Sequence, residues 1–221
     1  MTGIDWFPLL LSLRVALIAT AIAVLLGVAL AWALARRRFI GREILDAVAT
    51  LPLVLPPTVL GYYLLVLVGR GSPIGRAIES VFGQPLVFTW QGAVLAAAIG
   101  ALPLVIKTSR AAIAGVDENL ENAARTLGQT EWQVFRRVTL PLAFRGIVAA
   151  AMLAFARSLG DFGATLMVAG NIPGRTQTAA IAIYDATQAG RDQYALTLVL
   201  ILSAMALSLV YATNKLVKNG A

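Results

Sequence analysis

The sequence has no cysteine and no histidine, and only 13% of its 221 residues are charged. Without cysteine there is no disulfide bond and no thiol catalysis, and without either residue an ordinary structural zinc site is excluded. Imidazole acid–base catalysis is excluded for the same reason. The P-loop pattern G-x-x-x-x-G-K-[ST] is also missing, so the chain cannot hydrolyse ATP through that motif.

Apolar residues make up 59% of the chain, and the mean hydropathy is +0.80. Soluble domains are about half apolar and about one quarter charged, so a lipid bilayer is the expected solvent. Only helices and closed barrels satisfy the backbone there, and long apolar runs favour helices. We predict an all-α, polytopic membrane helix bundle in which residues 1–221 form a single transmembrane domain. The five predicted spans are Leu9–Ala35, Val48–Val68, Leu86–Ile106, Leu140–Leu159 and Tyr194–Thr213.

The flanking charges predict an orientation. We expect the first span to be retained, because Met1–Pro8 has no basic residue and the following apolar run is too long for a signal peptide. Eleven Lys and Arg residues flank the spans on one side and four on the other, which places the N-terminus outside and the C-terminus in the cytoplasm of a prokaryotic inner membrane. A nucleic-acid binder would gather these charges on one soluble surface, so no nucleic-acid partner is expected.

The loop between the third and fourth spans is polar but patterned like a helix–turn–helix. Gly128 lies where a left-handed cap would end the first helix, and Thr130 and Gln133 have capping-box spacing for a second one. Pro141 suits the first turn of the next span. The first helix has one apolar stripe, formed by Val116, Leu120, Ala123, Ala124 and Leu127. Such a stripe packs either on its own bundle or in the groove of a partner.

The segment Glu121–Gly128, followed nine residues later by Val138-Thr139-Leu140-Pro141, resembles the cytoplasmic EAA loop of ABC importer permeases. The resemblance implies that residues 116–138 form a coupling loop, whose first helix docks in a cleft of a separate ATPase subunit that binds ATP and Mg²⁺. This chain itself would then hold no cofactor. The implied coupling residues are Glu121, Ala123, Ala124, Leu127, Gly128 and Pro141. The paired alanines would allow close approach, and Glu121 would pair with a basic group of the partner or cap locally.

A wider resemblance covers nearly the whole chain and points to the molybdate permease subunits, with sulfate and tungstate permeases as close relatives. It is carried by Leu51–Tyr62, Glu121–Gly128, Phe155–Thr165 and Asn171–Thr176, the last of which fits the molybdate group best. The resemblance implies a type I ABC importer permease fold that works as a homodimer. It also implies two cytoplasmic ATPase subunits and a periplasmic or lipid-anchored oxyanion-binding protein as partners.

Two features are candidates for the pathway of the oxyanion. Pro56 and Pro57 remove amide donors and must kink or break the second span, which either lines the pathway or is merely bent. Arg157 lies near the end of an apolar run, where it either attracts a dianion or forms a plain ion pair with Asp161.

The segment Asp161–Asp192 lies outside by this topology and is too broken for a sixth span. It is either a re-entrant or short-helical gate that receives the binding protein, or an ordered outer loop. Its neutral donors, suited to weak oxyanion contact, are Thr165, Asn171, Thr176 and Thr178.

Two other classes fit less well. An ion-coupled carrier normally places carboxylates inside its spans, and these are absent here. A membrane anchor for a cytoplasmic complex would use the same loop, but it leaves the broken second span without a purpose.

Overall fold

The computed structural model describes residues 5–37 and 39–218, so Arg38, one of the eleven basic residues counted above, lies outside it. Every regular element in these residues is helical, as predicted. The long helices are α1 (Phe7–Arg36), α5 (Trp90–Ala114), α8 (Leu140–Leu159) and α11 (Asp192–Lys218). The shorter elements are α2 (Arg42–Val54), α3 (Pro57–Val68), α4 (Pro73–Phe82), α6 (Glu118–Thr126), α7 (Glu131–Val134), the π-helical segment η1 (Phe135–Thr139), α9 (Gly163–Ala169) and α10 (Ala179–Gln188).

The predicted number of membrane spans agrees with the structure when α2 and α3 are taken together. Four helical segments of the described residues are each long and apolar enough to cross a bilayer, and α2 with α3 makes a fifth that is bent by 117°. The stretch Val48–Val68 was therefore correctly predicted to break, but it is not one straight crossing. The break falls at Leu55 and Pro56, which are both extended, because Pro56 and Pro57 cannot donate to the preceding turn.

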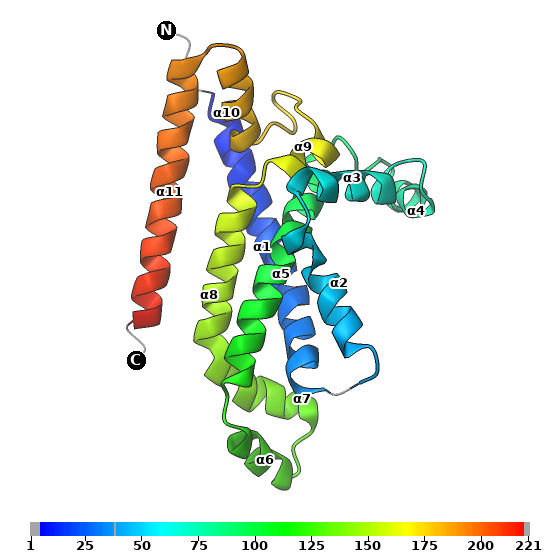
Figure 1. Ribbon diagram of the computed structural model, residues 1–221, viewed down its shortest axis with the longest axis vertical. Coiled ribbons are helices and arrows are strands. Elements are labelled where there is room, and N and C mark those ends of the chain that lie inside the picture. Colours follow the sequence, from blue (N-terminus) through cyan, green and yellow to red (C-terminus); the bar gives the residue numbers. More distant parts are fainter. Residues whose placement is uncertain (1–4, 38, 219–221) are drawn as a thin grey trace.

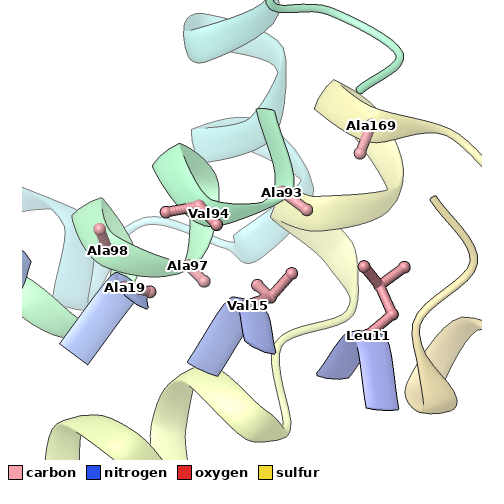
Figure 2. Packing of buried hydrophobic residues seen from close by; sticks show 8 residues of the cluster. All are labelled: Leu11, Val15, Ala19, Ala93, Val94, Ala97, Ala98 and Ala169. Atoms are coloured by element: carbon pink, nitrogen blue, oxygen red, sulfur yellow. The ribbon is translucent and has the colours of Figure 1, made fainter. Parts of the chain in front are cut away.

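The bundle core is built from small side chains on α1, α5 and α8. Figure 2 shows the upper part, where Leu11, Val15 and Ala19 of α1 meet a row of residues on α5. That row consists of Ala93, Val94, Ala97 and Ala98, and Ala169 of α9 closes the cluster. Membrane helices associate through such small residues because they let backbones approach closely. α5 is the central helix, because 67% of its most apolar 18-residue stretch is buried, against 11% of the corresponding stretch of α11.

The second helix of the predicted helix–turn–helix does not end before the next span. α7, η1 and α8 form one continuous helical segment from Glu131 to Leu159. The π-helical turn directly precedes Pro141, whose ring would otherwise clash with the carbonyl of Arg137 in an α-helical register. Pro141 does lie in the first turn of α8, as predicted, but it marks a change of helix type rather than a start from a loop.

The ends of the molecule are arranged as an odd number of crossings requires. Figure 1 shows the N-terminus at one end of the long helices, with α6, α7 and the C-terminus toward the other. α10 joins the N-terminal end of the bundle, while α3 and α4 project sideways from it. The predicted coupling loop and the C-terminus therefore share one side.

We predict that Gly61→Ala lowers the thermal unfolding midpoint in detergent, because α3 and α9 are in backbone contact there. A Cβ at Gly61 would lie 2.7 Å from Met167 Cβ and 2.9 Å from Ala164 Cα. Forcing a methyl group into such a contact costs about 1–3 kcal/mol. Gly71→Ala is the control, since its Cβ would meet nothing within 4 Å. Equal midpoints for the two variants would contradict this packing.

Candidate functional site

The predicted coupling loop is a short capped helix, a glycine turn and a second capped helix. Asp117 starts α6 by accepting a hydrogen bond from the Asn119 amide at 2.9 Å. Gly128 has φ +80°, so it occupies the left-handed conformation that the sequence predicted for it. Thr130 and Gln133 form the predicted capping box at the start of α7.

The apolar stripe that includes α6 packs partly on its own bundle and is partly exposed, as a groove-binding helix would be. Val116 and Ala124 are buried on the bundle, whereas Ala123 is exposed. Leu120 is 49% exposed and Leu127 is 81% exposed. The helix therefore attaches to its own chain with one edge and presents an apolar surface with the other. We call the exposed set of Leu120, Ala123 and Leu127 the outer face of α6.

Glu121 occupies the attached edge of α6, which corrects both roles suggested for it. Its side chain is only 2% exposed and lies 3.1 Å from Arg36 Nε, at the end of α1. Its other oxygen accepts a hydrogen bond of 2.6 Å from the Thr139 hydroxyl in η1. A carboxylate buried in this way neither reaches a partner's cation nor caps its own helix. Burial is tolerated because the charge is paired and hydrogen-bonded.

Sequence reasoning counted Arg36 only as a charge flanking a span. The structure places its guanidinium at the junction of α1, α5 and α6, where it donates to the carbonyl oxygens of Ile113 and Val116 at 3.0 Å each. It also donates to Glu118 at 3.0 Å. The signal for this role is weak in a sequence, because these partners lie far from Arg36 along the chain.

A second ion pair joins α6 to α7. Arg125 donates to both carboxylate oxygens of Glu131, at 2.7 and 3.1 Å. That hydrogen bonding raises the pKa of Arg125 above its ordinary value, so its charge persists at any physiological pH. Beside this pair, Trp132 is 61% exposed and its ring lies 5.6 Å from that of Phe135. α7 therefore exposes one large aromatic ring, in addition to the two exposed leucines of the outer face of α6.

The broken second span lies against the start of α9. A Cβ at Gly163 would lie 2.9 Å from Pro57 Cβ, so the two segments touch where the helix breaks. On its other side the break is uncovered, because Pro56, Pro57 and Thr58 are all exposed and Val54 is 80% exposed.

Arg157 and Asp161 form the ion pair that the sequence offered as one alternative. The Arg157 guanidinium donates to Asp161 at 2.9 Å, and Asp161 is almost completely buried whereas Arg157 remains 31% exposed. Asp161 also accepts from the amide and hydroxyl of Thr165, at 3.0 and 2.6 Å. The guanidinium lies beside Gly100 on α5, and Asp161 is two residues before Gly163, which meets Pro57 at the break. The arginine, its carboxylate partner and the broken span are therefore neighbours.

The remaining gate candidates are largely engaged inside the chain. Asn171 donates to Asp185 at 3.1 Å and accepts from Gln177 at 2.8 Å. The Thr176 hydroxyl accepts from the Ile172 amide at 3.2 Å. The Thr178 hydroxyl is buried without a hydrogen bond, since Ser12 takes over the capping of α10. The segment Asp161–Asp192 forms two short helices, which agrees with the prediction that it is no sixth span.

An open pocket of about 600 Å³ lies away from this region, at the start of α2. It contains Arg42 and Arg110, but Glu43 and Asp46 line it too, and Asp46 pairs with Arg110 at 2.9 Å. These charges balance, so the pocket offers no net attraction to a dianion.

The family model described as "Binding-protein-dependent transport system inner membrane component" matches residues 23–216. The chain belongs to this family. Membership agrees with the multi-pass helical architecture and with the inner-membrane location predicted from the sequence, and the family's description implies a binding protein as partner.

Similarity to individual permeases extends over nearly the whole chain. This chain is 47% identical over 208 residues to the molybdenum transport system permease protein ModB of Escherichia coli K12, covering 94% of this chain and 91% of that protein. A sulfate transport system permease protein, CysT of the same organism, is 34% identical and covers 93% of this chain and 74% of that protein. In fold, an inward-facing structure of the MetNI methionine ABC transporter matches with a TM-score of 0.74 at 17% identity, over 96% of this chain and 94% of that one.

We predict that Asp161→Asn lowers the free energy of unfolding more than the double change Arg157→Gln with Asp161→Asn. The single change leaves a partly buried guanidinium without its counter-charge, a loss of about 1–3 kcal/mol for hydrogen bonds to charged groups. Denaturant unfolding of the purified chain in detergent measures the difference. If the double variant loses as much free energy of unfolding as the two single variants lose together, the pair makes no coupled contribution.

Proposed function

We propose that this chain is the transmembrane permease subunit of an ATP-driven importer for molybdate. Two copies enclose the path, two cytoplasmic ATPase subunits bind ATP and Mg²⁺, and an external oxyanion-binding protein, periplasmic or lipid-anchored, delivers the substrate. In this arrangement the N-terminus is outside, the C-terminus and the coupling loop are cytoplasmic, and the chain itself catalyses no reaction.

The observation that carries the substrate is the 47% identity to a molybdenum permease over 94% of the chain, well above the 34% identity to a sulfate permease. The stretch Asn171–Thr176, which resembles molybdate permeases most closely, adds local support. Tungstate is so similar to molybdate in charge and size that the same path would accept both. Sulfate is the alternative substrate within the same role.

The outer face of α6 supports the proposed contact with an ATPase. Apolar side chains on a helix that extends beyond the membrane would be covered in a working complex, because water disfavours them. Leu120 and Leu127 would fill the cleft of the ATPase, Ala123 would allow close approach, and Gly128 would turn the chain away. An amphipathic helix laid in a groove is a recurring mode of recognition.

The uncovered break between α2 and α3 supports a pathway beside Arg157. Irregular backbone at membrane depth is tolerated where it lines a water-filled cavity or is buried by protein, but not where it faces lipid. The exposed residues at Pro56 and Pro57 therefore face the path or the second copy. Arg157 retains donors beyond the one given to Asp161, while that carboxylate offsets most of its charge. A weakened cation attracts a dianion without trapping it.

We predict that Leu127→Ser reduces co-purification of the ATPase subunit by about tenfold or more, as expected for a residue at the centre of an interface. The control is Val81→Ser on α4, a residue that is also largely exposed, at 75%, but lies away from the coupling loop. Both variants are to be compared in detergent by the amount of ATPase recovered per permease. Equal recovery from the two variants would exclude docking through this face.

We predict that unlabelled molybdate and tungstate compete with labelled molybdate for uptake into proteoliposomes, whereas the same excess of sulfate competes far less. The measurement uses the assembled complex with its binding protein and ATP. Equal competition by sulfate would replace the molybdate assignment with a general oxyanion importer. Uptake without ATP would remove the ABC importer role altogether.

A further inference from the structure

We propose that Arg36 is a positioning residue that makes the coupling helix α6 move together with the ends of α1 and α5. The proposal rests on the proposed function, in which an ATPase displaces α6 during each cycle. It concerns how that displacement reaches the membrane helices, and it arises from the contacts of Arg36, a residue to which the resemblance assigned no role.

The first observation is that Arg36 hydrogen-bonds three acceptors, on α5, on the turn after it and on α6, and forms an ion pair with a fourth acceptor on α6. Its guanidinium donates to the carbonyl oxygens of Ile113 in the last turn of α5 and of Val116 just after that helix. It contacts Glu118 at 3.0 Å and Glu121 at 3.1 Å, both on α6. The guanidinium is a planar fork with five donors, so one arginine can hold both a helix end and two carboxylates.

The second observation is that Arg36 and Glu121 are shielded from water. The Arg36 side chain is 11% exposed and that of Glu121 is 2% exposed. Removing one partner of such a pair leaves a buried charge without compensation, which is strongly destabilising. The contact between α6 and α1 therefore resists separation far more than a surface ion pair would.

The third observation is that the same carboxylate holds the π-helical turn. The Thr139 hydroxyl donates to Glu121 at 2.6 Å, and η1 leads without interruption into α8. Trp32 of α1 reinforces this junction, because its ring lies 4.9 Å from that of Phe135 in η1. Arg36 and Glu121 thus connect α6 to α1, to α5 and to the start of α8.

These contacts divide α6 into two edges with separate tasks. The outer face of α6 is free to bind an ATPase, and the charged edge is attached to the bundle. A helix held only by its apolar face would slide on the bundle when pushed. Attached through Arg36, it transmits the push to the three helices that form the core.

The test compares Arg36→Met with Arg37→Met in the complete complex. Each change removes one positive charge at the same membrane boundary, but Arg37 is exposed and stacks on Trp32 at 4.9 Å, without contacting Glu118 or Glu121. We expect Arg36→Met to lower the molybdate transported per ATP hydrolysed by about tenfold, within the usual range of coupling between sites. Arg37→Met should keep the wild-type ratio.

A distance measurement separates positioning from general damage. The chain has no cysteine, so spin labels at Asn119→Cys on α6 and Ala29→Cys on α1 are the only labelled sites in each of the two copies, given partner proteins without cysteine. Both residues are exposed. We expect one distance distribution with and without ATP in the otherwise unchanged complex, and a broadened or ATP-dependent one in Arg36→Met.

Two further variants keep the test decisive if Arg36→Met does not reach the membrane. Arg36→Lys retains the charge but offers a single nitrogen, so we expect an intermediate transport ratio. Glu121→Gln should lower the ratio in the same direction. Wild-type ratios and distances in these variants would overturn the proposal while leaving the importer function intact. Absence of ATP-driven uptake by the unmodified complex would instead overturn the proposed function.

Discussion

A broken backbone inside a membrane must be kept from lipid, and much of this architecture follows from that constraint. Pro56 and Pro57 end one helix and begin another at a bend of 117°. The freed backbone is covered on one side by α9, which approaches closely because Gly61 and Gly163 have no side chains. The other side stays open within one chain, so the fold is complete only when water or another chain occupies that side.

At the coupling loop, charge as well as apolar surface attaches the loop to the bundle. The usual amphipathic helix buries its apolar stripe and exposes its charges. In α6 a glutamate is buried while two leucines face outward. Arg36 balances the charge of this carboxylate, and the Thr139 hydroxyl donates a hydrogen bond to one of its oxygens, so the inversion is stabilised within this chain. Buried polar groups of this kind are tolerated only when they are paired.

Sequence reasoning predicted the elements well where the causes are local. The spans follow from hydropathy, the break follows from adjacent prolines, and the loop follows from Gly128 and the capping box at Thr130. It failed for Glu121, because periodicity predicts that a helix has two faces but not which one turns inward. The bend angle at Pro56 was equally beyond reach, since it depends on packing between α3 and α9.

In the candidate pathway, too, local contacts were predictable from the sequence and long-range contacts were not. The pairing of Arg157 with Asp161 was predictable because an i, i+4 spacing brings side chains together on one helical turn. The hydrogen bonds that occupy Thr165 and Asn171 were not, because they depend on how the chain folds back after α8. Substrate preference rests on similarity across the whole chain rather than on any single contact.

The inward-facing carboxylate of α6 also has an evolutionary consequence. The residues that attach the loop to its bundle and those that face outward do not overlap, so each set is free to change without disturbing the other. A permease of this design could exchange one ATPase for another by substitutions confined to its leucine-bearing surface. Partner choice and mechanical attachment are then separately heritable properties of one nine-residue helix.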